Sequence, residues 1–294
     1  MRLLRRSEWV VIAYFSYTAA VALVLPLRRP IPAVTLAMDA VVIGGTLLVA
    51  YAESLRHREF LKVLRDWYPL SLFLLAYREM GWFAPSHRTY RLEHLFEVWD
   101  KALLNSLGVK TAIEVLGPVL PSLLEIAYAV VYAIPAFSLA MLYAYRKSAR
   151  SERLLFTVAL GVLLVYMLFP YFPSEPPRTV FPGQDFPGYT TIFRRFNWWL
   201  LGGYGIHMSV FPSAHVSSSF ACAFAMRRAL PERPWVGRLL LVTAFLIAIA
   251  TVYGRYHYLA DAVAGFAVSL VAQAIAVGFE PAETSALGRG GRRG

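Results

Sequence analysis

Long apolar segments constrain the fold of this chain more than any other feature. Hydrophobic residues make up 58% of its 294 residues, and charged residues only 16%. The apolar residues are grouped in runs close to the roughly 20 residues that a helix needs to cross a bilayer. Because backbone amides inside lipid must be paired within their own segment, such runs form helices. The sequence therefore predicts an all-α, polytopic transmembrane helix bundle.

Run length defines eight candidate crossings. They cover residues 9–27, 33–52, 68–83, 119–145, 154–169, 214–226, 239–253 and 259–279. The third run is short and contains Arg78 and Glu79, so it is either a marginal span or a re-entrant segment. We therefore expect a bundle of six to eight spans.

A polar stretch at residues 85–117 interrupts the apolar runs. Its residues Leu92, Leu95, Phe96 and Trp99 recur at helical spacing, with charged residues between them. This pattern is typical of an amphipathic helix that lies on a surface. We expect such a segment immediately before the later spans.

Basic residues account for the net charge of +11 and lie in short clusters between the apolar runs. Clusters in this arrangement orient spans and meet anionic headgroups, so nucleic acid is not an expected partner. With eight crossings, every cluster and both termini fall on the cytoplasmic side. The first run is expected to be an uncleaved span rather than a signal peptide, because another apolar run follows at once. An excess of Arg over Lys agrees with a bacterial plasma membrane.

Polar residues with catalytic chemistry gather on the opposite, outer face. His257 and Asp261 are four residues apart at the start of the last run. On a helix they share a face, so the carboxylate can hold one ring nitrogen and leave the other free as a nucleophile. The pair predicts that His257 is a nucleophile oriented by Asp261.

A second histidine, His215, follows Pro212 and Ser213 at the start of the run at 214–226. Pro and Ser are favoured at the first positions of a helix, where unpaired amides and the positive end of the helix dipole attract phosphate. Ser213 is therefore a candidate phosphate-binding residue. His215 would lie beside the anion and can protonate the departing oxygen.

Two arginines are candidate counter-charges for a phosphate. Arg178 ends a Pro-Pro-Arg segment in the outer loop, and Arg255 lies two residues before His257. A planar guanidinium can hold two phosphate oxygens at once and stabilise transition-state charge. A snorkelling residue at the membrane interface is the alternative for Arg255. No two histidines have metal-ligand helical spacing near a carboxylate cluster, so we expect no metal and no cofactor.

The Pro-Ser-Ala-His segment at 212–215, together with His257 and Asp261, resembles the second and third motifs of the type 2 phosphatidic acid phosphatase superfamily. The resemblance covers about residues 154–265. It implies that His257 forms a phosphohistidine, that Asp261 supports it, and that His215 protonates the leaving group.

The chain departs from the phosphatase pattern in its first motif and at Thr251, where the third motif has an arginine. These departures resemble the inositol phosphorylceramide synthase branch, as do Trp67-Tyr68-Pro69, Tyr77-Arg78-Glu79 and Trp99-Asp100 in the front half. The resemblance implies a lipid phosphotransferase that acts on a phospholipid headgroup, with a lipid or an alcohol as acceptor. The alternative is a lipid phosphate phosphatase, for phosphatidate or polyprenyl phosphate, with water as acceptor. A non-catalytic scaffold or transporter is disfavoured, because its polar groups would lie near mid-membrane.

Three parts of the chain follow from this interpretation. Residues 1–118 contain the N-terminal spans and the amphipathic segment, and residues 119–279 form the catalytic transmembrane core. Residues 280–294 are rich in Gly and Arg and are expected to be a disordered tail. The sequence leaves the oligomeric state open.

Overall fold

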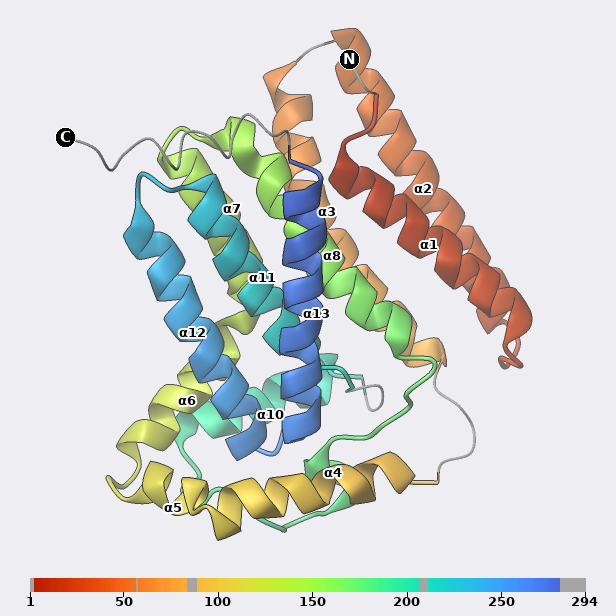
Figure 1. The fold of residues 1–294 in the computed structure, drawn as a ribbon. Helices are drawn as coiled ribbons and strands as arrows, with labels where there is room; N and C mark the ends of the chain where they lie inside the picture. Colours follow the sequence, from red (N-terminus) through yellow and green to blue (C-terminus); the bar gives the residue numbers. More distant parts are fainter. Residues whose placement is uncertain (1–2, 57, 84–88, 207–210, 281–294) are drawn as a thin grey trace, which may run out of the picture.

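The computed structural model describes residues 3–56, 58–83, 89–206 and 211–280. Every regular element in these ranges is helical. The long helices pack side by side and form a bundle with two ends (Figure 1). The predicted all-α fold is confirmed. The expected tail at 280–294 lies outside the described residues, apart from Glu280.

The long helices form the body of the bundle. They are α1 (Arg6–Val24), α2 (Ile31–Arg56), α3 (Glu59–Met80), α6 (Val119–Val130) with α7 (Ile134–Ala144), α8 (Ser151–Leu168), α11 (Ala214–Ala229), α12 (Pro234–Tyr253) and α13 (Leu259–Gly278). Among the described residues, six segments are long and apolar enough to cross a membrane: α1, α2, α6 with α7, α8, α12 and α13. Two more helices, α3 and α11, run beside them, but α3 carries several charges and α11 has only 16 residues.

The helix α3 begins at Glu59 and not at residue 68, where the apolar run starts. Its first turns contain Arg65 and Asp66, both of which are buried. Arg65 lies 2.5 Å from Glu8, and Asp66 lies 2.6 Å from Arg5. Because tertiary ion pairs neutralise these charges, the helix continues through residues that hydropathy assigns to a loop.

The helix α8 is the centre of the bundle. Most of its side chains are buried, and it packs against α1, α3, α11 and α13. The hydroxyl of Ser217 on α11 donates to the carbonyl of Gly161 at 2.6 Å. A Cβ atom on Gly161 would lie 2.8 Å from the Cβ of Ala221, so only glycine permits this approach. Small residues bring the backbones of α8 and α11 together, as in other membrane helix pairs.

Figure 1 shows one end of the bundle where α1 begins and α13 ends. Basic residues lie there before α1, in the first turns of α3, in the turn between α7 and α8, and in the last turn of α11. This end contains the Arg5 and Arg65 pairs described above. Arg150 pairs with Glu232 at 2.8 Å, and Arg228 pairs with Glu280 at 2.8 Å. We call it the terminal end.

A cap of short helices covers the opposite end. It consists of α4 (Arg91–Lys101), the π-helical turn η2 (Ala102–Ser106), α5 (Val109–Glu114), α9 (Pro177–Val180) and α10 (Ile192–Tyr204). In Figure 1, α4 and α5 lie crosswise below the ends of the long helices. The cap therefore lies where the outer loop and the starts of α11 and α13 meet.

The helix α4 forms where an amphipathic helix is expected, but its two faces are not divided by polarity in the usual way. Glu93, Glu97 and Asp100 are buried. Leu95 and Trp99 are 53% and 49% exposed. Residues 85–88 of the expected segment lie outside the described ranges. The acidic face of α4 is thus turned toward the protein, and the reason lies in the contacts of Arg255 described below.

Candidate active site

Three segments that are far apart in the sequence meet beneath the cap. They are the loop that carries Arg178, the start of α11, and the turn between α12 and α13. The backbone amide of Arg178 donates to the carbonyl of Arg255 at 3.3 Å, and that of Ser213 donates to the carbonyl of Asp261 at 2.9 Å. These main-chain bonds bring the sequence-predicted site residues into one region.

His257 and Asp261 form the expected pair, but not as two residues on one helix. His257 lies in the turn before α13, and Asp261 is the third residue of that helix. Asp261 Oδ2 lies 3.2 Å from His257 Nδ1 and also accepts the amide of Tyr258 at 2.9 Å. The carboxylate therefore caps the helix and orients the imidazole at once. With the proton on Nδ1, the Nε2 lone pair is left for attack.

His215 is the second residue of α11 and faces His257. The centroids of the two imidazole rings are 5.5 Å apart. Nε2 of His215 lies 3.3 Å from the hydroxyl of Tyr132, and the rings of Tyr128 and Tyr132 are each 5.3 Å from its ring. Sequence reasoning missed Tyr132, because a tyrosine inside an apolar run gives no signal of its own.

Ser213 is fully buried at the N-cap of α11. Its hydroxyl accepts the amide of Val216 at 3.3 Å, so the predicted helix start is present. A Cβ atom on Gly265 of α13 would lie 2.4 Å from the carbonyl oxygen of Ser213. The absence of a side chain at Gly265 allows α13 to approach the start of α11 closely enough to join the two histidines.

Arg178 lies beside the turn of His257, and within the described part of the chain it forms no salt bridge with a carboxylate. Its Nη1 donates to the carbonyl of Tyr256 at 3.2 Å, and its guanidinium carbon lies 5.8 Å from the centre of the Tyr256 ring. A neutral carbonyl and a ring face orient the guanidinium but leave its charge uncompensated. The group is thus suited to meet an anion.

Arg255 has a different environment from the one expected of a phosphate ligand. It is fully buried, its Nη1 lies 2.5 Å from Asp100, and its Nη2 lies 2.5 Å from Glu97. Asp100 also accepts the amide of Leu259 at 2.8 Å. Burial raises the pKa of Asp100 to about 7, although the Leu259 amide and the Arg255 charge act in the opposite direction. Both terminal nitrogens of Arg255 are therefore engaged by α4.

A cavity of about 390 Å³ extends from His215 into the bundle. Helices α3, α7, α8 and α11 and the turn η3 (Val131–Ala133) form its walls. Most of its lining is apolar, with Leu70, Phe73 and Val162 among the residues, while Tyr77 and His215 contribute polar atoms. Its volume is within the usual range of about 300–1,000 Å³ for ligand sites.

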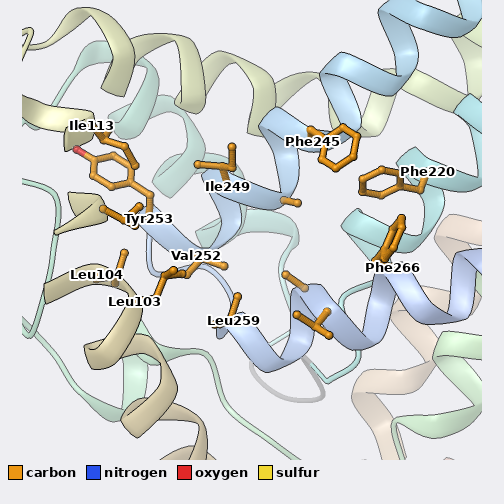
Figure 2. Close-up of a pocket in the computed structure, with 14 residues that line it drawn as sticks. Leu103, Leu104, Ile113, Phe220, Phe245, Ile249, Val252, Tyr253, Leu259 and Phe266 are labelled. Atoms are coloured by element: carbon orange, nitrogen blue, oxygen red, sulfur yellow. The ribbon is translucent and has the colours of Figure 1, made fainter. Parts of the chain in front are cut away.

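A second cavity, of about 330 Å³, lies between α11, α12 and α13 and reaches η2 and α5 of the cap. Figure 2 shows Phe220, Phe245 and Phe266 grouped at one side and Leu103 and Leu104 at the other. Its lining contains no histidine and no charged side chain. It has the shape of a site but none of the chemistry found at His215.

The fold and these groups define a class of protein: a helical membrane bundle with two facing imidazoles, a carboxylate and a cation at one end. Histidine attack on phosphorus and proton donation to the departing oxygen are the chemistry that such groups can perform. The model of one family, described as the PAP2 superfamily, matches residues 106–275, which is more than half of the chain. The chain belongs to the PAP2 superfamily. Its long apolar helices are those of an integral membrane protein.

One curated relative agrees with this assignment. A PA-phosphatase related-family protein from Dictyostelium discoideum is 42% identical over 60 residues, which is 20% of this chain and 10% of that protein. The match thus covers only a tenth of the relative's length. No solved structure matches the chain.

Proposed function

We propose that the protein transfers a phospho-headgroup from a phospholipid to a lipid or alcohol acceptor through a phosphohistidine at His257. The observation that carries this proposal is the 5.5 Å approach of the His215 and His257 rings, with Asp261 Oδ2 3.2 Å from His257 Nδ1. Within the described residues, His257 has an orienting carboxylate, whereas the ring of His215 meets the hydroxyl of Tyr132. This asymmetry supports a nucleophile in His257 and an acid and base in His215.

The reaction has two balanced steps. In the first, Nε2 of His257 attacks phosphorus, the bond from phosphorus to the lipid oxygen breaks, and protonated His215 gives its proton to that oxygen. In the second, the acceptor hydroxyl loses its proton to His215 and attacks phosphorus, and the P–N bond to His257 breaks. The charge of Arg178 would stabilise the equatorial oxygens in both steps.

The cavity beside His215 supports a lipid as the substrate. A hydrocarbon chain would occupy its apolar part, while the phosphate remains at the polar end with His215. The hydroxyl of Ser213 caps α11. We therefore expect Ser213 to act indirectly, by holding the first backbone amides of α11 toward the phosphate. Membership of the PAP2 superfamily supports the same chemistry.

The identity of the acceptor separates the proposal from its alternative. The Pro-Pro-Arg segment at 176–178 and the missing arginine at Thr251 resemble the inositol phosphorylceramide synthase branch, which supports a lipid acceptor. A lipid phosphate phosphatase would use water at the same position. The purified protein should therefore be given phospholipid labelled in its phosphate. Label in a new lipid supports transfer, whereas label released as free phosphate supports the phosphatase.

A control for this experiment is the His257→Gln protein, in which no labelled product should form. An acid-labile phosphoryl-enzyme should appear in the unaltered protein and not in the control. Label that remains in the donor, with no phosphoryl-enzyme, would contradict both the transferase and the phosphatase.

We also propose that the cap faces the outside of a bacterial plasma membrane and that both termini are cytoplasmic. The basic clusters at the terminal end support this orientation. Cys222, the one cysteine of the chain, is buried, so an introduced cysteine reports alone. Gln184→Cys on the cap side should react with an impermeant thiol reagent in intact cells, and Glu232→Cys should not. The reverse labelling would place the site in the cytoplasm.

A further inference from the structure

The acidic face of α4, formed by Glu93, Glu97 and Asp100, is an unusual feature of the cap. The three residues are spaced by four and three positions, which places them on one side of a helix. Each is at most 4% exposed. Carboxylates are rarely buried unless they bind cations or amides, so this face requires specific partners. Those partners lie in the segments that carry the candidate active site.

Asp100 and Glu97 bind the turn that contains His257. Arg255 lies between them with both terminal nitrogens at 2.5 Å from a carboxylate oxygen. Asp100 also accepts the amide of Leu259, the first residue of α13, through its other oxygen at 2.8 Å. His257 therefore lies between two residues, Arg255 and Leu259, that both donate hydrogen bonds to Asp100.

Arg255 also supports the segment that carries Arg178. Its carbonyl accepts the amide of Arg178 at 3.3 Å, and the next carbonyl, that of Tyr256, accepts the Arg178 side chain at 3.2 Å. Arg255 has a left-handed backbone with a φ of 62°. Non-glycine residues rarely adopt this conformation, and it persists where surrounding contacts hold it. The side-chain contacts to α4 are the contacts that can do so.

The first acidic residue of the face reaches the same loop directly. Glu93 Oε1 accepts the amide of Glu175 at 2.9 Å, three residues before Arg178. One face of α4 therefore contacts both the turn of His257 and the loop of Arg178.

We propose that the acidic face of α4 positions the active site, with Asp100 and Glu97 acting through Arg255 to hold His257 and Arg178 in register. This inference rests on the proposed function, because positioning is meaningful only for the reaction at His257. It gives Arg255 a role different from the phosphate contact predicted from its position in the sequence. The residues of the α4 face are positioning residues and do not touch the substrate.

A displaced nucleophile binds substrate but reacts slowly, so the expected effect falls on kcat. Misplacement of reacting groups by about 1 Å can cost about 100-fold in rate. Asp100→Asn keeps the shape and an oxygen for the Leu259 amide but removes the charge that holds Arg255. We expect kcat to fall about 10- to 100-fold, with little change in KM.

The experiment compares Asp100→Asn, Arg255→Lys and the double variant in the purified full chain. The readouts are kcat and KM with short-chain phospholipid in detergent, and the affinity for vanadate, which imitates the pentavalent phosphorus. Asp185→Asn is the matched control, because Asp185 accepts an exposed hydrogen bond from Asn105 elsewhere on the cap. If Asp100 acts through Arg255, the double variant should be no slower than the slower single variant.

The outcomes separate this inference from the proposed function. An unaltered protein without turnover overturns the proposed function and this inference together. An active protein whose kcat survives Asp100→Asn, or in which the two single effects multiply, overturns the inference alone, as does an equal loss in Asp185→Asn. If Asp100→Asn does not fold, Glu97→Gln replaces it, because it removes one carboxylate from Arg255 and leaves Asp100 in place. Unchanged kcat and vanadate affinity in Glu97→Gln would then overturn the inference.

Discussion

The two cavities of the bundle are similar in size and differ in chemistry. One, of about 390 Å³, ends at His215, and the other, of about 330 Å³, is lined by apolar side chains and Tyr253. They use different faces of α11, since Ala214, His215 and Ser218 line the first and Phe220 lines the second. Apolar enclosure is thus available at several places in a membrane bundle. A site arises where such a cavity meets polar groups that the fold has not already paired.

The largest effect is expected at the polar end of the first cavity. His257→Gln removes the nucleophile while Asp261 can still cap α13 through the Tyr258 amide. Turnover should fall by about 10⁴-fold or more, as for other nucleophiles. Rapid-quench detection of the phosphoryl-enzyme and a thermal melt measure chemistry and folding separately. Substantial turnover by a folded variant would show that His257 is not the nucleophile. The cavity at His215 would then no longer be distinguished from the other one by its chemistry.

His215→Gln tests the polar end of the first cavity by changing how the rate depends on the leaving group. General acid catalysis contributes about 10²- to 10⁴-fold and matters most when the departing oxygen is basic. The variant should lose most of its rate with a lipid alcohol leaving group and much less with nitrophenolate. The measurement is the rate of phosphoryl-enzyme formation for both substrates. An equal loss for both would show that His215 does not donate the proton.

Arg178→Lys tests whether the uncompensated cation serves the phosphate. Lysine keeps the charge but loses the planar fork, and a lost transition-state donor costs about 100-fold in rate. Vanadate affinity should fall along with kcat. Arg195→Lys, on the exposed side of α10, is a control that should leave both quantities unchanged. Normal vanadate affinity in Arg178→Lys would make the Pro-Pro-Arg loop a structural element only.

The smallest effect is expected from filling the cavities, and it compares them directly. Ala136→Trp narrows the cavity at His215, and Ala248→Trp narrows the other one. Both alanines are half-buried, so the two changes are matched in chemistry. We expect Ala136→Trp to raise KM for a long-chain lipid by about tenfold, which corresponds to 1.4 kcal/mol. Ala248→Trp should leave KM unchanged, and the opposite result would assign the substrate chain to the apolar cavity of Figure 2.

The sequence located most of the candidate site because its residues act locally. His257 and Asp261 are four residues apart and Ser213 is next to the start of an apolar run, so short-range geometry brings each group to a helix end. The capping role of Asp261 does not follow from this spacing. The spacing suggests a shared helix face, whereas the carboxylate accepts the amide of Tyr258 and meets His257 outside the helix. Both arrangements fit the same four-residue separation.

By itself, the sequence determined the helical bundle, because a bilayer leaves an apolar segment no other way to pair its amides. It also indicated the end of the bundle at which the histidines meet. Only the tertiary structure decided what each polar group binds. Arg255 is engaged by Asp100, 155 residues away in the sequence, whereas Arg178 contacts a carbonyl and a ring face among the described residues. A buried charge takes the partner that the fold brings within about 4 Å, and local spacing carries no information about residues so far apart.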